Sequence, residues 1–148
     1  MFKGHFVNSI NEKGRLSIPS KFREVIDRWE ADYLIITKGL PEKCLMAFIP
    51  SEWEKIEDKA RQLSMVRKAE IVFRRHVIGS AEECHLDAQG RILVPSCLRE
   101  YAGLKRKCLF VGIIDRFEIW DQETYDKFME AALEDEDKLR EGLADLGL

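Results

Sequence analysis

The sequence predicts an α+β protein, mainly β, in which two tandem repeats form one body with flanking amphipathic helices. Three observations support this prediction. Gly14 and its surroundings recur around Gly90, which reveals an internal repeat. Short aliphatic and β-branched segments lie next to these glycine turns, as strands do. Apolar residues recur at helical spacing in residues 51–63 and 121–132.

The repeat is clearest between residues 11–25 and 87–101, where six of fifteen aligned positions are identical. Chance alignment gives about one identity, so the match indicates a true internal repeat. A unit of about 45 residues buries little core alone. We therefore expect the two copies to pack together as a pseudo-dimer within one chain. The identical pairs are Gly14/Gly90, Arg15/Arg91, Pro19/Pro95, Ser20/Ser96, Arg23/Arg99 and Glu24/Glu100.

Each copy is expected to begin with an extended segment and a turn at its glycine, since glycine readily adopts positive φ. A short strand follows, and Pro19 or Pro95 then opens a short helix. Extra residues of the first copy are expected in the turn-rich stretch 38–43. The predicted extended segments are 2–10, 16–18, 33–37 and 44–49 in the first copy and 76–86, 92–94, 107–112 and 117–121 in the second.

An amphipathic helix closes each copy. In the first, Ser51 and Glu54 match a capping box. In the second, Asp121 is the expected N-cap. The apolar stripes are Trp53, Ile56, Ala60 and Leu63, and Tyr125, Phe128 and Ala132. The predicted organisation is a first repeat at 5–50, a bridging helical segment at 51–78, a second repeat at 79–122, and a C-terminal helix with an acidic tail at 123–148.

The net charge of −3 is unevenly distributed along the 148 residues. Residues 129–148 hold seven acidic and two basic residues, a net charge of −5, which leaves +2 on residues 1–128. The body is therefore mildly basic, and the overall acidity does not exclude a nucleic-acid partner. No apolar stretch approaches the roughly 20 residues of a membrane span. The first residues lack the apolar core of a secretory signal, so we expect a cytoplasmic protein.

Enzyme and metal functions find little support. Cys44, Cys84, Cys97 and Cys108 have no zinc-type spacing with each other or with the three histidines, so no metal and no cofactor is expected. No G-x-x-x-x-G-K-[ST] phosphate loop is present. Cys97 could be combined with His76 or His85 into a thiol catalyst, but the first copy has Lys21 at the matching position. We expect no catalytic residue.

The turns Lys13-Gly14-Arg15 and Gln89-Gly90-Arg91 are the strongest candidate sites. Asn11 and Asp87 can accept hydrogen bonds from nearby backbone and so fix each turn. The arginine fork suits phosphate oxygens and guanine edges. The alternative is a solvated turn whose arginine forms a surface ion pair, and recurrence of the arginine in both copies favours a function.

Further basic residues lie outside the turns. Lys3, Lys21 and Arg23 are candidates for phosphate contact. Arg23 and Arg99 have an alternative role in helix-surface ion pairs that brace the motif. Residues 105–107 form the densest basic run, in an expected solvated loop after Gly103.

At these residues the sequence resembles the MraZ family of bacterial transcriptional regulators over essentially the whole chain. The matching motifs are Phe2-x-Gly4, Asn11-Glu-Lys-Gly-Arg15, Leu16-x-Ile-Pro19, Asp87-Ala-Gln-Gly-Arg91, Val-Pro95 and Phe117-Glu-Ile-Trp120. The resemblance implies two AbrB-like (SpoVT-AbrB) repeats in a swapped-hairpin, barrel-like fold. It also implies a ring-shaped homo-oligomer (an octamer or dodecamer), associated with the nucleoid.

The resemblance further implies repression of the division and cell-wall gene cluster, including the protein's own operon, by binding direct repeats in double-stranded promoter DNA. The family pattern in each loop is an acid, three residues and an arginine. Asp87 and Arg91 fit this pattern, whereas Asn11 departs from it and brings no charge. We therefore expect Arg15 to be less firmly oriented than Arg91.

The combined prediction is a sequence-specific DNA-binding regulator without a membrane partner. Because one chain offers few contacts, several protomers on successive DNA repeats would raise the affinity. The alternative is an oligomeric protein-interaction scaffold whose arginine loops bind acidic partners. The acidic tail is expected to be a solvated helix end or a competitor of DNA. The predicted DNA-binding residues are Arg15, Lys13, Gly14, Arg91, Gly90, Lys3, Lys21 and Arg23, with Asn11 and Asp87 orienting the loops.

Overall fold

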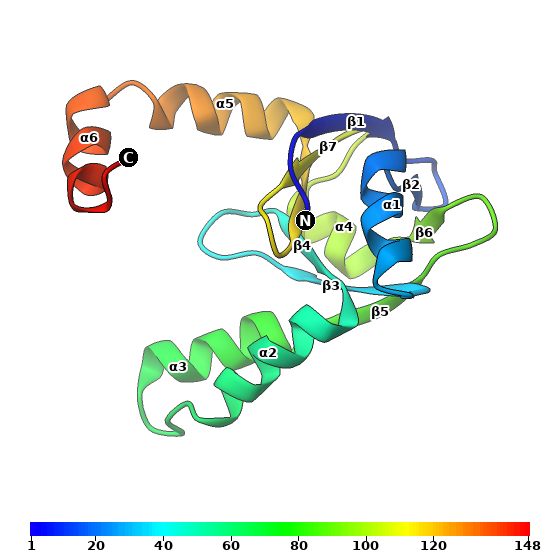
Figure 1. Cartoon of the computed structure of the whole chain (residues 1–148), viewed down its shortest axis with the longest axis horizontal. Helices are drawn as coiled ribbons and strands as arrows, with labels where there is room; N and C mark the ends of the chain where they lie inside the picture. Colours follow the sequence, from blue (N-terminus) through cyan, green and yellow to red (C-terminus); the bar gives the residue numbers. More distant parts are fainter.

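The computed structural model describes residues 1–148 as an α+β protein around an antiparallel sheet. Six strands pair in the order β1-β7-β8-β4-β3-β5, and β2 and β6 form a separate two-stranded ribbon (Figure 1). The strands are β1 (His5–Ser9), β2 (Arg15–Ser17), β3 (Tyr33–Lys38), β4 (Leu45–Phe48), β5 (Glu82–His85), β6 (Arg91–Leu93), β7 (Lys107–Gly112) and β8 (Phe117–Asp121).

Six α-helices surround the strands. None is long and apolar enough to cross a membrane. A π-helix, η1 (Arg74–Ile78), follows the third helix, and a 3₁₀ turn, η2 (Ala144–Leu146), ends the last one. The α-helices are α1 (Ser20–Arg28), α2 (Pro50–Arg61), α3 (Lys68–Phe73), α4 (Ser96–Ala102), α5 (Gln122–Ala132) and α6 (Glu136–Leu143).

The two repeats exchange strands. β1 of the first repeat pairs with β7 of the second, β5 of the second pairs with β3 of the first, and β2 pairs with β6. Each repeat therefore completes the other's sheet, as expected of copies too small to bury a core alone. The edge strands β1 and β5 do not pair with each other, so the barrel closure implied by the resemblance is not seen.

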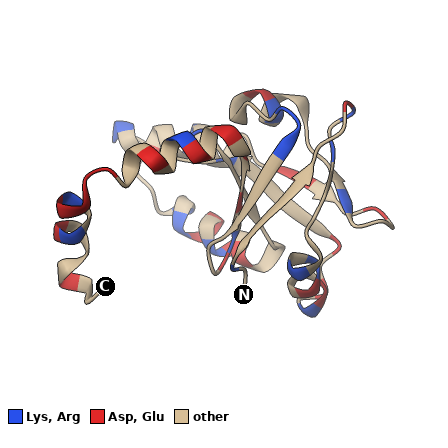
Figure 2. Cartoon of the chain, turned by 90° about the horizontal axis from the view of Figure 1, so that it is seen from above, with Lys and Arg blue, Asp and Glu red and all other residues tan.

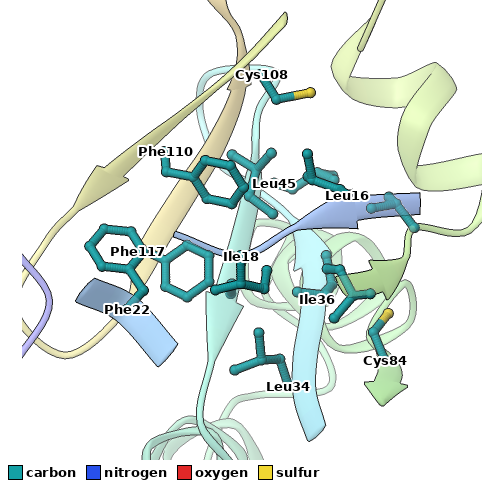
Figure 3. Packing of buried hydrophobic residues seen from close by; sticks show 14 of the residues in the cluster. Leu16, Ile18, Phe22, Leu34, Ile36, Leu45, Cys84, Cys108, Phe110 and Phe117 are labelled. Carbon is teal, nitrogen blue, oxygen red and sulfur yellow. The ribbon is translucent and has the colours of Figure 1, made fainter. Parts of the chain in front are cut away.

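The main core lies between the six-stranded sheet and the layer formed by β2, β6, α1 and α4. Leu34 and Ile36 of β3 face this core, whereas Ile35 faces the opposite side of the sheet, as strand alternation requires. Leu16 of the ribbon and Phe22 of α1 are both buried in it (Figure 3). Aromatic rings fill its centre, in a cluster of Phe2, Phe6, Phe22, Phe110 and Phe117.

Smaller clusters cover the other face of the sheet. Trp53 of α2 and Val77 of η1 pack on Ile35, while Trp120 of β8 packs with Leu109. α5 projects from the end of β8 and leads to α6, which lies apart from the body (Figure 1). The sheet is thus covered on both faces, and α6 is left outside the layers.

The order of strands and helices predicted from the sequence matches the structure in most elements. The predictions differ from the structure in four details. Residues 76–86 were expected to be extended, but η1 and a turn occupy their first part and β5 begins at Glu82. The capping box at Ser51 is wrong, because α2 begins at Pro50 and no side chain caps it. The expected N-cap at Asp121 is confirmed, since it accepts from the Thr124 N–H at 3.1 Å.

The other two differences concern lengths and burial. The extra residues of the first copy do not all lie in the β3–β4 turn, because α1 has nine residues where α4 has seven. The rest lie in the turn, which spans 39–44 in the first copy and 113–116 in the second. The predicted apolar stripe of α5 contains no buried residue, and Phe128 is exposed.

Candidate nucleic-acid interface

The two glycine turns have the same backbone geometry. Gly14 and Gly90 have φ of 87° and 75°, in the left-handed region that favours glycine. In the first turn, Asn11 Oδ1 accepts from the N–H groups of Lys13 (3.0 Å) and Arg15 (2.9 Å). Asp87 Oδ1 makes the equivalent contacts with residues 89 and 91, both at 2.9 Å. Asn11 and Asp87 thus each accept two backbone hydrogen bonds within their own turns.

The turns lead into the β2–β6 ribbon, which positions both arginines. Leu16 and Ile92 are paired and point into the core, where both are fully buried. Because side chains alternate along a strand, Arg15 and Arg91 point to the outer face. Arg15 pairs with Leu93, and Arg91 pairs with Ser17. The two arginines are therefore diagonal neighbours, about 7–8 Å apart at their Cα atoms.

Each turn is supported by the opposite repeat. The Arg99 guanidinium, from α4 of the second repeat, lies so close to Gly14 that a Cβ there would be 2.8 Å from it. Arg23, from α1 of the first repeat, lies closer still to Gly90, where a Cβ would be 2.5 Å from its side chain. The N–H of Val94 donates to Gly14 O at 2.8 Å, a cross-repeat bond with a counterpart at Gly90 O. The positive φ therefore favours glycine at both turns, and a Cβ would also displace the overlying arginine.

Arg23 and Arg99 differ in how they complete this contact. Arg99 Nε donates to Val94 O at 3.0 Å, whereas Arg23 Nε is buried without a hydrogen-bond partner. Neither forms an ion pair with its glutamate neighbour, so the ion-pair alternative is not what the structure shows. The recurrence of both arginines is visible in the sequence, but their contact with the other repeat is not. Their recurrence at one offset from the prolines was the available signal.

The two loop arginines have different surroundings. Arg91 Nε donates to Asp87 Oδ2 at 2.9 Å, and its side chain is half-buried. The hydrogen bond from the Arg91 backbone N–H, the Arg91 guanidinium and the Gln89 N–H hold the pKa of Asp87 below its usual value. Arg15 is exposed and makes neither a side-chain hydrogen bond nor an ion pair. The expectation that Arg15 is less firmly held than Arg91 agrees with these contacts.

A groove beside each turn also differs in charge. The groove between the second turn and α1 is lined by four carboxylates and one arginine. The matching groove between the first turn and α4 is lined by two acidic residues, Glu12 and Glu100, and two basic residues, Arg99 and Lys105, so its charges cancel. An anionic ligand would therefore be repelled less at the first turn. The four carboxylates belong to Glu24, Asp27, Asp32 and Asp87.

Two of the remaining predicted bases, Lys3 and Lys21, lie away from the ribbon tip. Lys13 is exposed in the first turn, whereas Lys3 and Lys21 line a hollow beside α1 with Arg28. Lys105 Nζ lies 3.7 Å from Glu123 Oε2 and forms an ion pair with it. Asp121 and Asp126 line the same surface hollow. On the helices, Lys and Arg alternate with Asp and Glu rather than gathering on one broad face (Figure 2).

The thiol-catalyst alternative gains no geometric support. Cys97 is exposed and makes no hydrogen bond with either histidine. His76 Nε2 instead lies 3.1 Å from Gly39 O and 3.1 Å from the Tyr101 hydroxyl. Burial raises the pKa of Cys84 and that of Cys108 to about 12, which keeps both thiols protonated and unreactive.

The fold and the loops define a class of protein with two strand-exchanged repeats that present paired arginine turns on a common ribbon. A family model described as "MraZ protein, putative antitoxin-like" matches residues 1–76 and 77–145. The transcriptional regulator MraZ of Syntrophobacter fumaroxidans is 44% identical over 147 residues, covering 99% of this chain and 97% of that protein. The transcriptional regulator MraZ of Ligilactobacillus salivarius is 37% identical over the full length of both chains. The chain belongs to the MraZ family.

Proposed function

We propose that this chain is a sequence-specific DNA-binding transcriptional regulator. Its relatives are named transcriptional regulators, which supports regulation of transcription. Their names state no reaction, and we propose no catalytic activity. The proposed action is repression of the division and cell-wall gene cluster, including the protein's own operon, in the cytoplasm at the nucleoid.

The observation that carries the proposal is the free guanidinium of Arg15 on the outer face of a fixed ribbon. The Leu16–Ile92 pair buries the ribbon's inner face, so its outer face has a defined direction. The major groove of DNA admits a two-stranded β-ribbon, and arginine can bind both acceptors of a guanine. Lys13 adds a second free cation in the same turn.

The other predicted residues are proposed to support this contact. Arg91 is the counterpart of Arg15, with its terminal nitrogens available beyond the bond to Asp87. Lys3 and Lys21 contact phosphate and set the register on DNA. Arg23 supports the second turn through its contact with Gly90. Its phosphate contact is a separate part of the proposal.

We also propose a swapped-hairpin arrangement of the two AbrB-like repeats and a ring-shaped homo-oligomer, an octamer or dodecamer. The strand exchange between β1 and β7 and between β5 and β3 supports the first part. A ring presents several copies of the first turn to direct repeats in the promoter. Each added turn raises affinity through effective concentration.

The test is a fluorescence-anisotropy titration of Arg15→Ala with DNA from the region upstream of the gene. Loss of one bidentate guanine contact should weaken binding by about 1–3 kcal/mol and relax specificity at one position. Lys59→Ala on α2 is the matched control, because it removes one exposed positive charge away from the ribbon. Equal affinities of wild type and Arg15→Ala would refute the role of Arg15. Absence of any sequence-selective binding would favour the scaffold alternative.

A further inference from the structure

The acidic helix α6 lacks a partner within the chain. It has eight residues, none buried, and no hydrogen bond or ion pair joins it to the body. Isolated helices shorter than about 12–15 residues are marginal in water. Leu139, Leu143 and Leu146 are 39%, 40% and 68% exposed. Leu139 and Leu143 are four residues apart in α6 and share one face, so α6 is an amphipathic helix whose apolar stripe is uncovered, and Leu146 follows in η2.

A hollow beside α1 has the complementary character. Its floor contains Phe6, Phe22 and Val25, and its rim contains Lys3, Lys21 and Arg28 against one acid, Glu24. None of the three rim cations forms an ion pair within the chain. An apolar floor with basic edges fits the apolar face of an acidic helix.

The position of α6 favours docking between copies. α5 is a continuous helix that carries α6 away from the body, whereas α1 lies beside β1 on the side away from α6 (Figure 1). Because α5 leads away from α1, α6 would reach the hollow of the same chain only if α5 changed its direction. A second copy can present its hollow without any such change.

We propose that α6 of one copy docks in the hollow beside α1 of a second copy. The leucine stripe covers Phe6 and Val25, and Glu136, which shares the face of Leu139 and Leu143, meets Arg28. The contact joins two different surfaces, so it continues from copy to copy and closes into a ring or remains an open chain. The proposal rests on the self-association included in the proposed function and identifies the surfaces that make it.

The test is sedimentation velocity of the full chain over a concentration series. Arg28→Glu and Glu136→Lys should each weaken association by about two- to tenfold, because each replaces an attraction with a repulsion. The chain carrying both changes should return to within about twofold of wild type. Deletion of residues 134–148 should weaken association at least about tenfold, since it removes the leucine stripe. Arg28 is chosen because it is not among the proposed phosphate contacts.

Arg67→Glu is the control, since Arg67 is an exposed base between α2 and α3, beside exposed Met65 and Val66. It should leave association unchanged. If Arg67→Glu weakens association and Arg28→Glu does not, association uses that turn rather than the hollow and the proposal is wrong. If the deleted chain associates like wild type, this proposal fails and the ring must use other surfaces. If the wild-type chain is monomeric throughout, the proposed ring fails as well.

Discussion

The first turn, residues 11–15, and the second turn, residues 87–91, share their backbone hydrogen bonds but present their arginines differently. Arg15 extends freely, whereas Arg91 is tied to Asp87. An amide oxygen and a carboxylate oxygen accept the same two N–H groups, so either residue builds the turn. Only the carboxylate has a second charged oxygen for the arginine. The two turns therefore keep the same geometry, while a single side-chain difference gives them different electrostatics.

The largest expected effect concerns what the turns share. Leu16→Ala and Ile92→Ala should each lower the free energy of unfolding by about 2–5 kcal/mol, because each removes a fully buried side chain beneath the ribbon. Urea denaturation of both variants measures this. A loss confined to one variant would show that the two halves of the ribbon are not equivalent in the core.

The glycine substitutions should be nearly as costly. Gly14→Ala and Gly90→Ala should each cost about 1–3 kcal/mol, from a left-handed alanine and from the displaced arginine. Gly14→Ala should be less costly in an Arg99→Ala background, since the added methyl then meets only the Val94 carbonyl oxygen, at 3.0 Å, and no longer the guanidinium. Denaturation of the double-mutant cycle measures this coupling. An additive cycle would mean that Arg99 does not restrict Gly14.

DNA affinity should separate the two turns. Arg91→Ala should weaken operator binding by less than about 1 kcal/mol, a smaller loss than for Arg15→Ala, because Asp87 already neutralises much of its charge and the adjacent groove is acidic. Anisotropy titrations at one salt concentration compare the variants directly. If Arg91→Ala lost more affinity than Arg15→Ala, Arg91 would be the more important contact. A fixed orientation of the arginine would then matter more for DNA binding than a free charge.

Exchanging the orienting residues should produce a smaller change. Asn11→Asp should tie Arg15 as Arg91 is tied, and should lower affinity for non-specific DNA by about two- to fivefold through added negative charge. Operator affinity should change less, because a held arginine loses less side-chain entropy on binding. Asp87→Asn should change non-specific affinity in the opposite direction. If both variants bind DNA like wild type, the charge difference between the two turns does not affect DNA binding.

The smallest effect is expected from pH. The lowered pKa of Asp87 means that its bond with Arg91 is present above the usual value of 3.8 and is lost as pH falls through the lower folded value. NMR titration of the Asp87 carboxyl and the Arg91 Nε–H should therefore show the hydrogen bond between them breaking at a pH below 3.8. Asn11 does not titrate, so the Arg15 signals are the internal control and should not move with them.

Much of this organisation was predictable from the repeat itself. The turns, the ribbon strands beside them and the helices after Pro19 and Pro95 depend on local sequence, and they lie close to where they were expected. The π-helix at 74–78 was missed because apolar alternation in a short segment does not exclude helix. The capping box at Ser51 failed because Pro50 begins the helix one residue earlier.

Contacts between the repeats could not be predicted in the same way. The pairing of β1 with β7 joins residues about one hundred positions apart, and no local pattern specifies it. The positions of Arg23 and Arg99 over the opposite glycines depend on that exchange. The difference between Arg15 and Arg91 could be anticipated, because it follows from Asn11 and Asp87 four residues earlier.

The placement of Arg99 over Gly14 and of Arg23 over Gly90 has a consequence for how such a chain can be divided. A single repeat, expressed by itself, has the turn but not the arginine that supports it, and must meet a second copy to complete either one. Joining the repeats by α2 and α3 makes that encounter independent of protein concentration. Because both repeats belong to one chain, their sequences can differ. One turn can then bind a ligand while the other stabilises the ribbon.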